Sequence, residues 1–155
     1  MVTLKALADT IDADSDVAVM LAVLHSDITR LHQLVDAKAS LDVRNKEQRT
    51  PLMVAAARGN TDAVGILTKA RTQLDLVDER GDTALMCAAA QDHIDPVKCL
   101  GEANASTSVA NTADKTVLDV AIHRGNEAIL AILGDEATVQ SRDMTIMKHI
   151  FDVKV

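Results

Sequence analysis

The chain has 155 residues, a formal net charge of −7 and one aromatic residue, Phe151. An acidic chain without Trp or Tyr lacks the basic surface and the stacking rings of general nucleic-acid binders, and no apolar run approaches the roughly 18 residues of a membrane span. Because nearly half of the residues are apolar and the core must be aliphatic, we predict one soluble all-α domain in a reducing, cytoplasmic setting.

The first predicted element is a helix within residues 1–16 that caps the N-terminal end of the fold. Its apolar residues recur at helical spacing and form one stripe, made of Leu4, Leu7, Ala8 and Ile11. A repeat array needs such a cap to cover the apolar face of its end unit.

The acidic run DADSD at 12–16 has carboxylates at alternate positions, as a calcium loop does. A calcium-binding loop of the EF-hand type needs Gly and Glu where this chain has Val17 and Val23. We therefore interpret the run as a solvated turn in which Asp16 caps the next helix and favours its positive end.

Residues 17–44 are predicted to be the first and most degenerate of four similar segments spaced 33 residues apart. The identical pairs are Ala22 with Ala55, Leu34 with Leu67, and Asp42 with Asp75. This segment has Ser26 where the next one has a glycine.

The unit is clearest in residues 45–77, through the stretch TPLMVAAARGN at 50–60. Thr50 suits an N-cap and Pro51 the first helical position. A thin apolar stripe follows, made of Leu52, Ala55 and Ala56. Gly59 supplies the positive φ that a helix end favours. A second helix is predicted with four buried residues: Ala63, Val64, Ile66 and Leu67.

The segments 78–110 and 111–143 repeat this pattern without a gap. The cap threonine recurs as Thr50, Thr83 and Thr116, and the leucine two residues later as Leu52, Leu85 and Leu118. Self-similarity at a fixed period is the signature of a stacked repeat array. We therefore predict a series of short helix pairs that stack side by side.

These residues resemble the ankyrin repeat, whose Thr-Pro-Leu-His-x-Ala-Ala-x-x-Gly-His stretch is matched by TPLMVAAARGN. The resemblance covers three full copies, about 45–143, and implies an ankyrin-type solenoid of about four repeats. The family's histidine is replaced by Met53, Met86 and Asp119. We therefore expect its hydrogen bond to the cap threonine to be missing.

Two further departures concern glycines of the family pattern. The turn glycine is kept only as Gly81, with Gln48 and Asp114 at the equivalent positions. Asp92 occupies the position at which Gly59 and Gly125 end the first helix of the other two units. A non-glycine residue there is expected to cost roughly 1–2 kcal/mol.

Residues 144–155 predict a C-terminal capping helix that begins after Asp143. Its apolar face is made of Ile146, Met147, Ile150 and Phe151. With Met1 at the other end, these caps lead us to expect a complete chain.

The sequence offers no set of residues that predicts catalysis or metal binding. Cys87 and Cys99 flank His93 but lack the paired spacing of a zinc site, so we predict buried structural thiols. No register brings a histidine to a cysteine or carboxylate partner. We expect no cofactor, no metal and no enzyme; a hydrolase or metal enzyme on a helical array is the rival that metal analysis would detect.

A repeat array presents a concave face, formed by the turns between units and the first helix of each. The resemblance implies that a partner protein binds there. The candidate partner-binding residues are Lys46, Arg49, Arg58, Glu79, Arg80, Asp82, Gln91, Lys115, His123 and Arg124.

With Glu47 included, the charged members of this set are six basic and three acidic residues, on a chain of net charge −7. A basic inner face would favour a partner with an acidic segment, and the strongest anchors are expected to be Arg49, Arg58, Arg80 and Arg124. The alternative is that these charges are solvated and contribute little.

We therefore predict a non-catalytic, monomeric protein-interaction module that binds neither nucleic acid nor membrane. The alternative is a dedicated inhibitor or regulatory subunit of one enzyme, such as a kinase, since short ankyrin proteins that inhibit kinases have a similar length.

Overall fold

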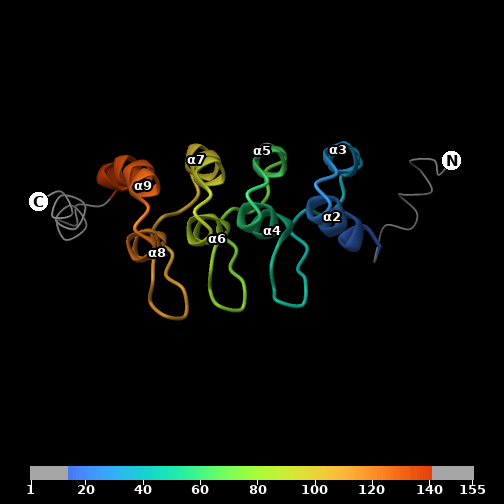
Figure 1. The fold of residues 1–155 in the computed structure, drawn as a ribbon. Helices are drawn as coiled ribbons and strands as arrows, with labels where there is room; N and C mark the ends of the chain where they lie inside the picture. The colour runs from blue at the N-terminus through green and yellow to red at the C-terminus, as the bar shows by residue number, and fades with distance from the viewer. Residues whose placement is uncertain (1–13, 141–155) are drawn as a thin grey trace, which may run out of the picture.

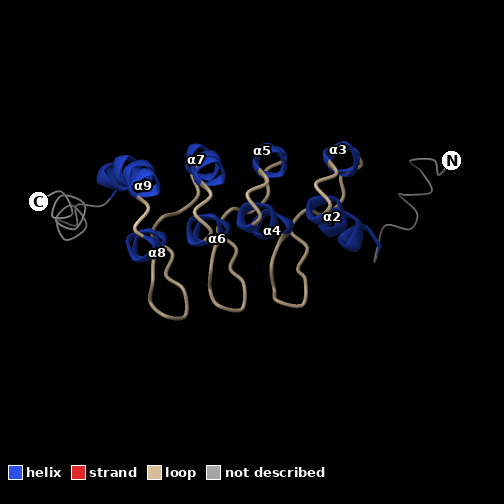
Figure 2. Ribbon diagram, in the orientation of Figure 1, coloured by secondary structure: helices blue, strands red, loops and turns tan. Residues whose placement is uncertain are grey.

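The computed structural model describes residues 14–140, and within that range it contains eight α-helices and no strand (Figure 1; Figure 2). In chain order the helices are α2 (Asp14–Leu24), α3 (Ile28–Asp36), α4 (Pro51–Ala57), α5 (Thr61–Lys69), α6 (Ala84–Ala90), α7 (Ile94–Glu102), α8 (Val117–Arg124) and α9 (Glu127–Gln140). The predicted all-α repeat solenoid is confirmed. The predicted cap at 144–155, and that at 1–16 apart from its last three residues, lie outside the described range.

The helices lie in two rows (Figure 1). The inner row holds α2, α4, α6 and α8, and the outer row holds α3, α5, α7 and α9. Each inner helix packs against the outer helix that follows it, and helices of one row pack against their neighbours in that row. The helix pairs therefore stack side by side in sequence order.

The three predicted cap threonines all begin inner helices. The hydroxyl oxygens of Thr50, Thr83 and Thr116 each accept a hydrogen bond from the backbone N–H three residues later, at 3.3, 3.3 and 3.4 Å. Pro51 occupies the first helical position, where its missing N–H costs nothing. Both predictions are confirmed.

The expectation that all three cap threonines lose the family's side-chain bond is wrong for Thr116. Its hydroxyl and its backbone N–H both donate to Asp119 Oδ2, at 2.9 and 2.8 Å. A short carboxylate at this position reaches back to the cap and completes a capping box. Met53 and Met86 cannot do so, and both are buried in the core instead.

The backbone has positive φ at every position where the sequence pattern places a glycine or its substitute. At the helix end φ is 72° for Gly59, 69° for Gly125 and 59° for Asp92. In the turns it is 59°, 75° and 55°, for Gln48, Gly81 and Asp114 respectively. The repeat geometry is therefore kept even where the glycine is not.

The core is built from aliphatic side chains and alanines that let the helices approach closely. Ala55, Ala56, Ala88 and Ala89 are fully buried. In α5 the predicted burial of Ala63, Val64 and Leu67 is confirmed. Ile66 is only partly buried, because it packs against the core with part of its surface and also lines an outer groove.

The prediction that Asp16 caps α2 is wrong, because the helix begins two residues earlier, at Asp14. Asp16 lies inside the first turn, where a carboxylate still favours the positive helix end. α2 has 11 residues, whereas α4 and α6 have seven each. This additional turn changes the N-terminal end of the stack, as described below.

Candidate binding surface

Three long loops project from the inner row and connect successive units (Figure 1). We call residues 40–49, 73–82 and 106–115 the first, second and third finger. Each finger closes with a backbone hydrogen bond that spans four residues. The donor N–H and acceptor carbonyl belong to Asn45 and Arg49 (3.0 Å), Asp78 and Asp82 (3.1 Å), and Asn111 and Lys115 (2.9 Å).

One side chain holds each finger tip, at a position that our sequence reasoning missed. Asn45, Asp78 and Asn111 each accept two backbone N–H groups through Oδ1, from the residues two and four positions later, at 2.9–3.0 Å. Asn and Asp favour such local turns. These residues recur every 33 residues, each five positions before a cap threonine, and this recurrence was a readable signal.

The fingers are also bonded to one another. Glu79 N–H donates to Glu47 carbonyl oxygen at 3.3 Å, and Thr112 N–H donates to Arg80 carbonyl oxygen at 2.9 Å. The side chain of Asn111 donates to Asp82 Oδ1 at 2.8 Å. The candidate residue Asp82 therefore helps to hold the fingers in register.

Two of the predicted arginine anchors form ion pairs within the protein. Arg49 Nε lies 3.3 Å from Asp78 Oδ2, and the Asp78 side chain is only 2% exposed. Arg124 Nε donates to Asp92 Oδ2 at 3.1 Å. This hydrogen bond holds the pKa of the Asp92 carboxyl below its ordinary value. The pair also gives Asp92 a partner in its left-handed backbone conformation.

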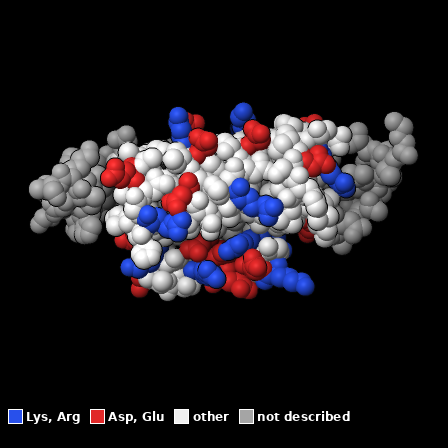
Figure 3. All heavy atoms as spheres, viewed as in Figure 1, with Lys and Arg blue, Asp and Glu red and all other residues white. Residues whose placement is uncertain are grey.

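These pairs change the charge balance of the surface. Asp78 and Asp92, which the sequence count did not include, neutralise Arg49 and Arg124. Figure 3 shows acidic and basic side chains intermixed over the fingers. Within residues 14–140 four basic candidates are exposed without an ion pair: Lys46, Arg58, Arg80 and Lys115. The other exposed candidates are Glu79, Gln91, His123 and Arg124, of which Arg124 is paired with Asp92.

The family model described as ankyrin repeats in three copies matches residues 19–110 and 69–143. The chain belongs to the ankyrin repeat family. No curated protein matches it. Ankyrin repeats generally act as protein–protein interaction modules and are typically non-catalytic.

The described part of this ankyrin repeat protein contains no group of three or more His, Cys, Asp and Glu side chains placed to hold a metal ion. No helix among residues 14–140 is both long and apolar enough to cross a bilayer.

The two cysteines differ in their surroundings. Cys87, on the inner helix α6, is buried as predicted, and burial together with the nearby charge of Asp78 raises the pKa of its thiol to about 12. Cys99 is only half-buried, contrary to expectation, and lines a groove of about 620 Å³ across the outer helices. Outer helices of ankyrin pairs are covered on one side only, which leaves this thiol accessible.

We expect iodoacetamide at pH 8 to modify Cys99 and spare Cys87 in the folded protein. Raising the pKa from 9.0 to about 12 reduces the thiolate fraction of Cys87 about a thousandfold, and the thiolate is the nucleophile. Mass spectrometry of tryptic peptides measures both sites. In urea both thiols should react, and equal rates in the folded protein would contradict this assignment.

Proposed function

We propose that this protein recognises a partner protein through the concave face formed by its inner helices and fingers, without catalysing a reaction. The observation that carries the proposal is the bonding of the fingers to one another. Finger tips fixed by Asn45, Asp78 and Asn111 and linked by backbone hydrogen bonds need little further ordering when a partner binds. Surfaces organised in advance keep more of their contact energy as affinity.

The partner surface that this face fits best contains an acidic segment. Arg58, at the end of α4, and Arg80, in the second finger, are exposed and engaged in no ion pair within the described residues. Their guanidinium groups can form bidentate bonds with carboxylates. Arg49 and Arg124 are less available because Asp78 and Asp92 already hold them.

Cys87 and Cys99 are both free thiols. Free thiols suit a reducing compartment, and we place the binding activity in the cytoplasm.

The test compares two double variants of equal charge. Arg58→Ala with Arg80→Ala removes two cations from the concave face, and Arg30→Ala with Lys98→Ala removes two exposed cations from outer helices α3 and α7. A partner is first obtained by affinity purification and mass spectrometry, and calorimetry then measures its affinity for each variant. We expect at least tenfold weaker binding, about 1.4 kcal/mol, for the concave pair only.

Circular dichroism should show the same helix content in both double variants, because all four side chains are exposed. If the concave double variant bound the partner as tightly as the unchanged protein, the proposal that the concave face binds the partner would be contradicted. If both double variants lost affinity equally, the effect would come from net charge and not from the position of the cations.

A further inference from the structure

Among residues 14–140, the first finger has an unpaired backbone donor on its N-terminal edge, whereas the equivalent donors of the second and third fingers are hydrogen-bonded. The second finger bonds to the first through Glu79 N–H, and the third bonds to the second through Thr112 N–H. The equivalent donor in the first finger is Lys46 N–H, 33 residues before Glu79. Within the part of the chain that the structure describes, Lys46 N–H has no hydrogen-bond acceptor.

Among the described residues, the segment in register with the end of a preceding finger is helical. Asp14–Asp16 correspond in the repeat register to Glu47–Arg49 of the first finger, but they form the additional turn of α2. A helical turn satisfies its own backbone carbonyls and offers none to Lys46. Within residues 14–140, no backbone carbonyl therefore pairs with this edge of the first finger.

The side chains of α2 that a preceding finger would cover are exposed as well. Val17 is 55% exposed, whereas Thr50 at the equivalent position of the second unit is 1% exposed. Leu21 is 43% exposed, and its equivalent Val54 is 8% exposed. Exposed aliphatic side chains at positions that are buried in the next repeat indicate an interaction surface.

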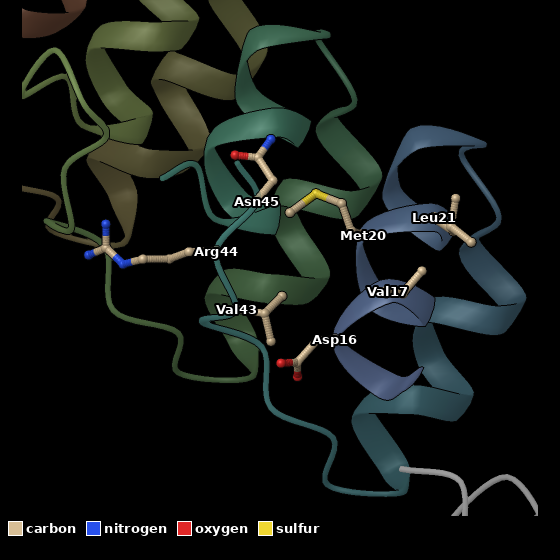
Figure 4. A pocket seen from close by; sticks show the side chains of 7 residues that line it. All are labelled: Asp16, Val17, Met20, Leu21, Val43, Arg44 and Asn45. Carbon is tan, nitrogen blue, oxygen red and sulfur yellow. The ribbon is translucent and has the colours of Figure 1, made fainter. Parts of the chain in front are cut away.

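These features meet at a cleft of about 180 Å³ between α2 and the first finger (Figure 4). Its apolar wall is formed by Val17, Met20, Leu21 and Val43. Protein cavities of roughly 150 Å³ hold a benzene molecule, so the cleft has room for one aliphatic side chain.

The charge at the rim of the cleft is negative. Asp16 contributes a carboxylate with no ion pair among the described residues. Arg44 also lines the cleft, but its Nη1 donates to the carbonyl oxygens of Gln48 (3.1 Å) and Val77 (2.7 Å), on the side of the next finger. Figure 4 shows the guanidinium of Arg44 directed away from Asp16.

We propose that this N-terminal cleft binds an extended peptide segment of a partner protein, which lies beside the first finger as the second finger does on its other side. A peptide carbonyl accepts the Lys46 N–H, an aliphatic side chain enters the cleft, and a neighbouring Lys or Arg pairs with Asp16. Addition of an extended segment to an open backbone edge is an established recognition mode. The site is separate from Arg58 and Arg80, so the two proposals stand or fall independently.

The test uses the full chain, labelled with ¹⁵N and in its methyl groups, and two synthetic probes. One is acetyl-Ser-Thr-Val-Arg-Thr-Ser-amide, and the other has Asp in place of Arg. We expect the first probe to shift the Lys46 amide and the Val17 and Leu21 methyl signals in a saturable manner. The second probe should bind at least fivefold more weakly, because its carboxylate faces Asp16.

Two variants of α2 locate the binding. Leu21→Gln places an amide in the cleft, whereas Leu24→Gln makes the same change at a position 37% exposed on the same helix and outside the cleft lining. We expect at least a fivefold loss of affinity for the first variant and no change for the second. Both side chains are exposed, so both variants should fold.

Hydrogen exchange of the free chain shows whether the edge of the first finger is covered by the chain itself, by a second copy, or by neither. We expect the Lys46 amide to exchange at least tenfold faster than those of Glu79 and Thr112, which are bonded. Protection of Lys46 at every protein concentration would mean that the chain covers its own edge. Protection that rises with concentration would mean that a second copy does. Either result, or the absence of saturable shifts, overturns the proposal.

Discussion

Replacing Asp78 with Ala should destabilise the protein by about 2–4 kcal/mol. The change removes the acceptor of two backbone N–H groups, from Arg80 and Asp82, and leaves Arg49 without its buried partner. A hydrogen bond contributes about 1 kcal/mol, bonds to charged groups contribute more, and breaking a buried pair costs more than an exposed one. Because Arg49 is itself part-exposed, solvent reduces the loss. Urea denaturation measures the free energy of unfolding.

Asp78→Asn is the matched control, because the protein already uses Asn at the same position of its other two fingers. Asn45 and Asn111 show that an amide oxygen accepts both backbone bonds. Only the charge opposite Arg49 is lost, and we expect a cost below about 1.5 kcal/mol. If both variants were equally unstable, the ion pair rather than the turn would hold the finger.

Most of the fold could be predicted from the 33-residue period of the sequence. Once Thr50, Thr83 and Thr116 were placed in register, local rules for caps, apolar stripes and glycine ends sufficed to position the helix pairs. These rules act within one unit, where every partner lies within a few residues in the sequence. The capping box at Asp119 was also local, and it was missed only because the family's histidine was taken as the one residue able to bond the cap threonine.

The candidate surface could be predicted only in outline. The same period placed the fingers and the exposed ends of the inner helices on one face. It did not reveal that Asp78 lies against Arg49 or Asp92 against Arg124, because these pairs join neighbouring units, 29 and 32 residues apart. Their geometry depends on how closely the units stack. Counting charges by position therefore overstated how basic the face is.

The N-terminal cleft was beyond sequence reasoning for a related reason. The acidic run at 12–16 was interpreted as a turn, which would have left room for a finger-like loop before the first unit. The structure shows Asp14–Asp16 as helix. Among the described residues, Lys46 N–H is then left without an acceptor, and Val17 and Leu21 of α2 are exposed. Acidic residues are favourable in a first helical turn, so helix and turn compete closely in such a run.

The second large effect should come from Gly59→Ala, with a cost of about 2–4 kcal/mol. Gly59 has a φ of 72°, where a β-carbon costs about 1–2 kcal/mol. A β-carbon there would also lie 2.8 Å from Cε1 and Nδ1 of His93. The ring cannot move without weakening the bond in which His93 Nε2 donates to the Ala57 carbonyl oxygen at 3.1 Å, worth about 1 kcal/mol.

Gly125→Ala separates the two causes, because Gly125 has a φ of 69° but open space around its added β-carbon. We expect it to cost about 1–2 kcal/mol, from the backbone alone. In a His93→Ala background the cost of Gly59→Ala should fall to the same value, since the clash has been removed. An unchanged cost in that background would show that the backbone conformation, and not the packing of one unit's histidine against the glycine of the preceding unit, requires Gly59.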